Sequence, residues 1–341
     1  MFTPQIKIVM TGPTGVGKTS LLASMYPLLA ESFPTGDYEL VPEEGTLTTL
    51  KDFRKKMRKL GTGGILVQDR VIQGNLDYSE FNFDLKYEDN NAFKTKELSL
   101  KIYDLPGAYC LESKEFDERS NTSVVKPPRA QEFLDGSDIS FWCIDSVALM
   151  DPQDHKGRWL GDDNDFVNRP AEIANCIRTS NLNEGHTVII VLMRAETYEQ
   201  DEQDRKDKKL FERLKTEYAK HVLELRKNEN IKNVYYCSVQ TTGNLLHNGG
   251  DKTVGYTFVR HAGRDYEPEN CDLPVLCAVQ KSLETVIHRV RWQYYRTAIW
   301  MPFIRFLLCR RLRSIERRLT NKLNNVNKEI SKRLDEGLFT W

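Results

Sequence analysis

The segment that most constrains the fold of this chain is residues 12–19, which read GPTGVGKT. It fits the pattern GxxxxGK[ST], follows the apolar run 6–10 and precedes the helical pattern 20–30. Glycines let such a loop wrap closely around phosphate groups and aim backbone N–H groups at them, and the helix N-terminus adds positive potential. The strand, glycine-rich loop and helix together predict a phosphate-binding loop at the start of an α/β domain.

The residues of this loop have distinct expected roles. Lys18 is expected to reach the β- and γ-phosphates of a nucleotide, and the Thr19 hydroxyl is expected to bind Mg²⁺. The residues expected to bind the nucleotide are Gly12, Thr14, Gly15, Val16, Gly17, Lys18, Thr19 and Ser20, with the Ser20 side chain packing beside the loop. The competing interpretation is a glycine-rich turn with a solvated lysine.

Asp104 ends the alternating segment 98–104 and is followed by Leu-Pro-Gly107. A P-loop nucleotide hydrolase needs an aspartate at a strand end beside the phosphate loop, where it holds Mg²⁺ directly or through water. In GTPases the glycine N–H of such a DxxG turn contacts the γ-phosphate, so Gly107 is expected to sense that phosphate. Lys18, Asp104 and Gly107 are the expected catalytic residues, and Thr19 and Asp104 the metal ligands. The alternative is an ordinary turn aspartate before Pro-Gly.

Strand and helix patterns alternate along the chain and predict an α/β fold with a mainly parallel sheet flanked by helices. The expected strands are 6–10, 78–87, 98–104, 139–145, 186–193 and 233–239, with 78–87 and 98–104 forming a hairpin. The expected helices are 20–30, 47–60, 171–179, 201–226 and 273–290. We assign residues 1–290 to one domain with insertions at about 35–70, 108–136, 151–170 and 243–273, and expect mainly loop structure in those insertions.

A C-terminal helical extension is expected over residues 291–341. It contains 12 Lys and Arg against 4 Asp and Glu, a net charge of +8, whereas residues 1–290 carry −8. The apolar stripe of this amphipathic helix is Leu312, Ile315, Leu319, Leu323, Val326, Ile330 and Leu334. We expect this helix to bind a protein partner or a second copy of the chain, and packing on its own domain is the competing interpretation. Contact with a membrane surface and contact with nucleic acid are further alternatives.

Composition excludes several classes of protein. Hydrophobic residues at 40% can build a core, which excludes bulk disorder. The seven cysteines form no CxxC pair and the six histidines lack metal-ligand spacing, so we expect reduced buried thiols and no zinc site. The start lacks a signal-peptide pattern, and the most apolar window, 297–309, is too short to span a bilayer. We expect a cytoplasmic location, with peripheral membrane contact as an alternative.

With these motifs in this order, the chain resembles the TRAFAC class of P-loop GTPases. GPTGVGKT, DLPG, SFWCID, HTVIIVLMRAE and VYYCSVQ follow one another as that class requires. Within the class, DISFWCIDSVALMD and LPVLCAVQKSLETVI are similar to segments of the bacterial double-GTPase-like family. The resemblance covers about residues 4–290 and implies GTP or GDP with Mg²⁺ as ligands.

The resemblance also implies which residues would bind the guanine base. GTPases clamp guanine with an [NT]KxD segment, and the corresponding residues here are Met193-Arg194-Ala195-Glu196. Glu196 would accept hydrogen bonds from the guanine N1–H and N2–H groups, and the Arg194 stem would cover the base. Ser238 lies where the family's loop touches the guanine carbonyl. The competing interpretation of MRAE is a plain charged turn.

Two positions depart from the GTPase pattern. The first-switch threonine has no clear counterpart, with Thr62, Thr46 or the Val67–Gln68 segment as candidates, and Ala108 and Tyr109 stand where many GTPases have a water-positioning glutamine. The resemblance therefore implies slow hydrolysis of GTP to GDP by a nucleotide switch, in a bacterial defence or conflict system. An ATP-binding P-loop protein and a degenerate GTPase that acts as a scaffold through its C-terminal helix are the alternatives.

Overall fold

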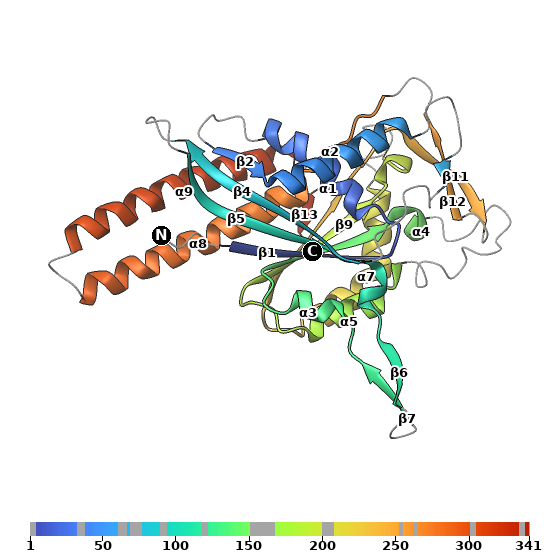
Figure 1. The fold of residues 1–341 in the computed structure, drawn as a ribbon, viewed down its shortest axis with the longest axis horizontal. Coiled ribbons are helices and arrows are strands. Elements are labelled where there is room, and N and C mark those ends of the chain that lie inside the picture. The colour runs from blue at the N-terminus through green and yellow to red at the C-terminus, as the bar shows by residue number, and fades with distance from the viewer. Residues whose placement is uncertain are drawn as a thin grey trace.

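The centre of the fold is an eight-stranded sheet with the strand order β13-β10-β9-β8-β1-β5-β4-β2 (Figure 1). The computed structural model describes residues 5–32, 38–60, 67–68, 77–88, 94–117, 122–150, 168–199, 208–251, 255–261, 265–300, 305–333 and 338–340. The strands of the sheet are β1 (Gln5–Thr11), β2 (Tyr38–Pro42), β4 (Ser79–Glu88), β5 (Lys94–Asp104), β8 (Ile139–Asp145), β9 (His186–Met193), β10 (Ile231–Ser238) and β13 (Leu338–Thr340). The strands from β5 through β1, β8 and β9 to β10 run parallel, which confirms a mainly parallel α/β sheet.

Successive side chains of the central strands point to opposite faces of the sheet, and each face has its own apolar core. In β9, Ile189 and Val191 join one buried cluster, whereas Val188 and Ile190 join the other. Helices α1 (Lys18–Ser32), α2 (Glu44–Lys59), α8 (Leu273–Trp300) and α9 (Arg305–Arg333) contribute to the first cluster. Helices α3 (Ala130–Leu134), α5 (Pro170–Thr179) and α7 (Lys209–Leu225) contribute to the second (Figure 1). Because both faces are covered, β8 and β9 are buried along their whole length and are mainly apolar.

Three segments expected to be loops contain strands. β2 pairs with β4 as an edge strand of the main sheet, within the expected insertion 35–70. β11 (Leu245–Asp251), β12 (Gly255–Arg260) and β3 (Val67–Gln68) form a separate antiparallel sheet. β6 (Ser113–Asp117) and β7 (Thr122–Lys126) form a hairpin that projects from the body (Figure 1). The loop predictions are wrong there because these strands are short and glycine-rich or polar, and lack apolar alternation. Residues 151–167 of the remaining insertion lie outside the described residues.

The C-terminal extension packs on its own domain. Helix α8 continues past residue 290, and α9 runs back along it (Figure 1). The stripe residues Ile315, Leu319, Val326 and Ile330 are buried in the same cluster as strands β1 and β8, and β13 then pairs antiparallel with β10. The helical extension is therefore confirmed, and in the part of α9 whose side chains are described, its stripe packs against its own chain.

His186, at the start of β9, gives folding stability a defined pH dependence. The ring is fully buried between the Ser140 hydroxyl and the Ser137 carbonyl, each 3.0 Å away, and burial lowers its pKa to about 4. Between pH 6.5 and about 4, His186 takes up a proton in the unfolded chain but stays neutral in the folded chain. The free energy of unfolding is therefore unaffected by this histidine above pH 6.5 and decreases as the pH falls from 6.5 toward 4. We expect a loss of about 3 kcal/mol from this group.

Urea unfolding of the wild type and His186→Gln at pH 7, 5 and 4 measures this contribution. The unfolding free energy of the variant should fall less steeply with decreasing pH, because glutamine does not titrate. Parallel curves for the two proteins would contradict the assignment of a neutral buried histidine.

Candidate functional site

The loop between β1 and α1 has the backbone that its glycines require. Gly12 has φ +138°, and a Cβ atom there would lie 2.4 Å from the carbonyl oxygen of Cys143 on β8. Gly15 and Gly17 also have positive φ, +83° and +99°. Side chains are disfavoured at such angles, so this loop shape needs glycine at these positions. The strand, loop and helix expected over this segment are all present.

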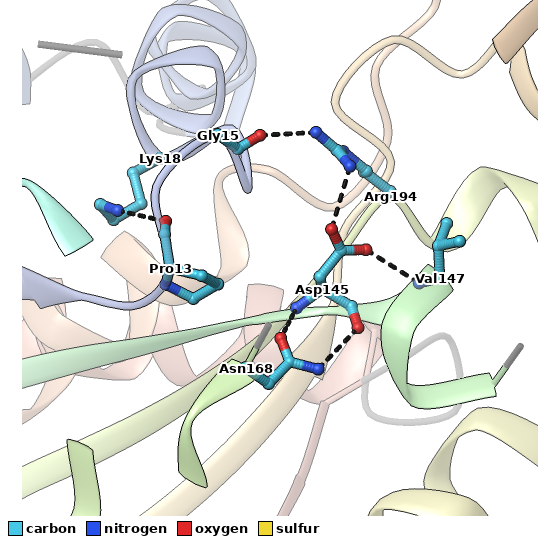
Figure 2. A network of polar contacts seen from close by, with 7 residues as sticks. All are labelled: Pro13, Gly15, Lys18, Asp145, Val147, Asn168 and Arg194. Carbon is cyan, nitrogen blue, oxygen red and sulfur yellow. Dashed lines mark hydrogen bonds and ion pairs between the residues drawn. The ribbon is translucent and has the colours of Figure 1, made fainter. Parts of the chain in front are cut away.

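Lys18, the first residue of α1, folds back over its own loop. Its Nζ donates to the carbonyl oxygen of Gly12 at 3.0 Å. It also donates to the carbonyl oxygen of Pro13 at 2.8 Å (Figure 2). The side chain is only 7% exposed. The amino group of Lys18 is thus held at the loop beside the helix N-terminus, which is where a phosphate group would be bound.

Thr19 and Asp104 meet because β1 and β5 are neighbouring parallel strands. The register pairs Met10 with Asp104, so the carboxyl ends of both strands reach the same edge. The Thr19 hydroxyl donates to Asp104 Oδ2 at 2.5 Å. Burial raises the pKa of Asp104, while the Lys18 charge and the Thr19 hydrogen bond act in the opposite direction.

This pair of oxygens fits a magnesium ion. Mg²⁺ prefers oxygen ligands and is bound by one or two protein groups together with waters and substrate phosphates. A divalent cation would also stabilise the charged form of the buried Asp104 carboxylate. In the described part of the chain no cluster of three or more His, Cys, Asp or Glu could hold a metal ion.

The turn after Asp104 lies directly against the phosphate loop. A Cβ atom on Gly107 would be 2.4 Å from the backbone nitrogen of Thr14 and 2.8 Å from its Oγ1 atom. No larger residue fits at Gly107 without moving the loop. The two expected phosphate-contacting segments are therefore in contact.

Arg194 bridges the end of β9 and the phosphate loop. Its Nη2 donates to the carbonyl oxygen of Gly15 at 2.5 Å, and its Nη1 pairs with Asp145 Oδ2 at 3.0 Å (Figure 2). Asn168 holds the backbone of Asp145 on both sides, accepting from its N–H at 2.7 Å and donating to its carbonyl at 3.1 Å. The guanidinium thus joins Asp145 to the loop between β1 and α1.

Sequence reasoning missed Asp145 and Asn168. Asp145 could have been found, because it ends a buried strand beside β1, and ligand-binding groups gather at the carboxyl ends of parallel strands. Asn168 offers no local signal, since it follows a long polar segment.

Glu196 is a buried carboxylate with one oxygen unused. Its Oε1 accepts from the Thr242 hydroxyl at 2.8 Å and the Thr242 N–H at 3.3 Å, while the buried Oε2 has no hydrogen-bond partner among the described residues. Burial raises its pKa. Thr242 lies in the turn that follows β10 and was not identified from the sequence.

Ser238 is engaged with a glutamate that follows β9. Its hydroxyl donates to Glu199 Oε2 at 2.8 Å, and the next N–H, of Val239, donates to the carbonyl of Leu192 at 2.9 Å. The hydrogen bonds to the Glu196 carboxylate come from Thr242, in the turn a few residues beyond Ser238.

The first-switch candidates are placed differently from one another. Thr46 lies on α2, where its hydroxyl accepts from the backbone N–H of Asn82 at 3.0 Å. Val67 and Gln68 form β3 and pair with Phe258 and Thr257 of β12. Thr62 lies outside the described residues.

The residues after the DLPG turn point in different directions. Ala108 is exposed, whereas the Tyr109 hydroxyl donates to Asp77. The Arg129 guanidinium lies 4.4 Å from the centre of the Tyr109 ring and donates to its hydroxyl. Tyr109 and Arg129 are thus engaged with each other and with Asp77.

Comparison with known proteins identifies no family: no protein-family model matches the chain, and no curated protein matches its sequence. Among the described residues, no helix is long and apolar enough to cross a membrane.

Proposed function

We propose that this protein binds a guanine nucleotide with Mg²⁺ and hydrolyses GTP slowly to GDP as a nucleotide switch of the P-loop GTPase class. The observation that carries the proposal is the meeting of Lys18, Thr19 and Asp104 at one edge of a parallel sheet, on a loop whose shape requires glycine. A role in bacterial defence rests on family analogy alone.

Each residue of the phosphate site has a role in this proposal. Lys18 neutralises charge on the β- and γ-phosphates, and Thr19 and Asp104 hold the magnesium ion, which screens phosphate charge when bound. Gly107 offers its N–H to the γ-phosphate from a turn that already touches Thr14. Ala108 has no group that can orient water, so hydrolysis is slow unless a partner supplies one.

Glu196 supports the choice of guanine. A buried acceptor without a partner costs free energy, and the N–H donors of guanine would remove that cost. ATP is the second candidate, because burial raises the Glu196 pKa and a neutral carboxyl offers one donor and one acceptor, as the adenine edge requires.

A partner remains part of the proposal. The exposed basic residues Arg313 and Arg317 lie on α9 away from its buried stripe, and they offer a contact for an acidic protein surface or a second copy. An anionic membrane or nucleic acid would be recognised by the same charge.

Replacing Glu196 by glutamine tests the base assignment. Glutamine keeps the size of the side chain and the acceptor for Thr242 but replaces the free oxygen by an N–H₂ group, which repels the guanine donors. We expect GDP affinity to fall about 10- to 100-fold, as for a buried donor left unpaired, with ADP affinity nearly unchanged. Competition between labelled and unlabelled nucleotides measures both.

Glu199→Gln is the matched control, because Glu199 follows the same strand but bonds Ser238. It should leave the preference between GDP and ADP unchanged. Tighter binding of ADP than GDP by the wild type would favour the ATP alternative, and an equal loss of both nucleotides in Glu196→Gln would remove the guanine assignment.

A further inference from the structure

A buried ion pair links three segments at the carboxyl edge of the sheet. The register pairs Asp145 at the end of β8 with Met193 at the end of β9, which brings Arg194 beside Asp145. The Asp145 side chain is 3% exposed and that of Arg194 is 14% exposed. The same guanidinium reaches the carbonyl oxygen of Gly15 in the phosphate loop (Figure 2).

We propose that Asp145 is a positioning residue of the nucleotide site, holding the Arg194 guanidinium against the Gly15 carbonyl and so fixing the shape of the phosphate loop. The inference rests on the proposed nucleotide-binding function. It assigns a role to Asp145 and gives the Arg194 guanidinium the role of supporting the loop.

The Asp145 carboxylate is itself held in place. Its Oδ1 accepts from the Val147 N–H at 2.9 Å, which leaves Oδ2 facing Arg194, and Asn168 fixes its backbone. A charge-assisted hydrogen bond between a fixed carboxylate and a guanidinium is among the stronger polar contacts in proteins. The anion therefore determines where the guanidinium lies.

The guanidinium has a further contact that a lysine cannot reproduce. Its centre lies 4.9 Å from the centre of the Phe258 ring on β12. A planar guanidinium can lie near an aromatic ring and still donate from two nitrogens, whereas an ammonium is a single point charge. Arginine at position 194 thus suits a bridge with several fixed partners.

Fixing the Gly15 carbonyl constrains the loop beyond that atom. The peptide group is planar and trans, so a carbonyl aimed at Arg194 turns the following N–H, of Val16, in the opposite direction. Val16 is among the residues expected to bind phosphate through the backbone. Loss of the bridge would therefore release the orientation of a phosphate-binding N–H group.

The experiment compares Asp145→Asn with the wild type for binding of GDP and ADP. Asparagine has nearly the same shape, but its amide must place a donor against either the Val147 N–H or Arg194. We expect affinity for both nucleotides to fall about tenfold or more, because misplacing a binding group is costly, while the ratio of the two affinities stays unchanged. Arg194→Lys should show the same even loss and retains a charge beside Asp145.

A double variant shows whether Asp145 acts through Arg194. In an Arg194→Gln background, Asp145→Asn should cost little further affinity, because contacts that share one network are not additive. Glu217→Gln is the control for removing a carboxylate, since Glu217 pairs with Arg213 on the exposed side of α7, and it should bind as the wild type does.

Three results would overturn the inference: Asp145→Asn binding within twofold of the wild type, a loss confined to guanine nucleotides, or fully additive losses in the double variant. If Asp145→Asn does not fold, Arg194→Lys decides by the first two criteria. If the wild type binds neither GDP nor ADP, the proposed function is refuted, and the inference about Asp145 falls with it because there is no nucleotide affinity for the variants to lower.

Discussion

Replacing Lys18 by alanine is expected to abolish nucleotide binding, with GDP affinity reduced by at least about 100-fold, since an ammonium buried beside phosphate contributes several charge-assisted hydrogen bonds. The fold should survive, because the two hydrogen bonds of Lys18 given above join it only to its own loop, and Lys18 belongs to no apolar cluster. Titration calorimetry of GDP with Mg²⁺ measures the affinity, and thermal unfolding checks the fold.

Lys227→Ala is the matched control for losing a lysine. Lys227 is exposed and pairs with Glu224 near the end of α7, far along the chain from the loop. It should bind GDP as the wild type does. Lys18→Ala binding within threefold of the wild type would refute the phosphate-loop assignment itself.

The meeting of the glycine-rich loop with Asp104 could be predicted because its parts are set by local sequence and by one rule of sheet geometry. The loop at Gly12 and Lys18 is contiguous, and its strand and helix are marked by apolar patterns on either side. Asp104 is distant along the chain, but it ends a strand, and parallel neighbours bring their carboxyl ends together.

The residues that follow β9 and β10 could not be placed in the same way. Arg194 has a left-handed backbone conformation, with φ +64°. The direction of its side chain depends on this conformation, which the sequence does not reveal. Its partners, Asp145 and the Gly15 carbonyl, lie 49 and 179 residues away along the chain. The hydrogen bonds to Glu196 come from Thr242, and this depends on where β10 ends within the sheet.

The edges of the main sheet were also beyond prediction. β13 has three residues and β2 has five, too few for an alternation to be recognised. Each is stabilised by pairing with a longer strand, β10 or β4, rather than by its own pattern. Tertiary pairing therefore decides their conformation.

The second large effect concerns α9. A chain ending after residue 304 lacks α9 and β13, and with them the buried Ile315, Leu319, Val326 and Ile330. Each such side chain contributes about 1.5–3 kcal/mol when fully buried, so together they approach the whole stability of a typical domain, about 5–15 kcal/mol. We expect the truncated chain to be unfolded or insoluble, as judged by circular dichroism and sedimentation.

A single substitution makes the same argument quantitative. Leu319 is 2% exposed, and Leu319→Ala should lower the free energy of unfolding by about 2–5 kcal/mol in urea titrations. Leu223→Ala is the control, because Leu223 is 63% exposed and its loss should change stability by less than about 0.5 kcal/mol. A stable truncated chain, or a Leu319→Ala variant as stable as the control, would show that the stripe is not part of the core and would return α9 to the role of a surface for a partner.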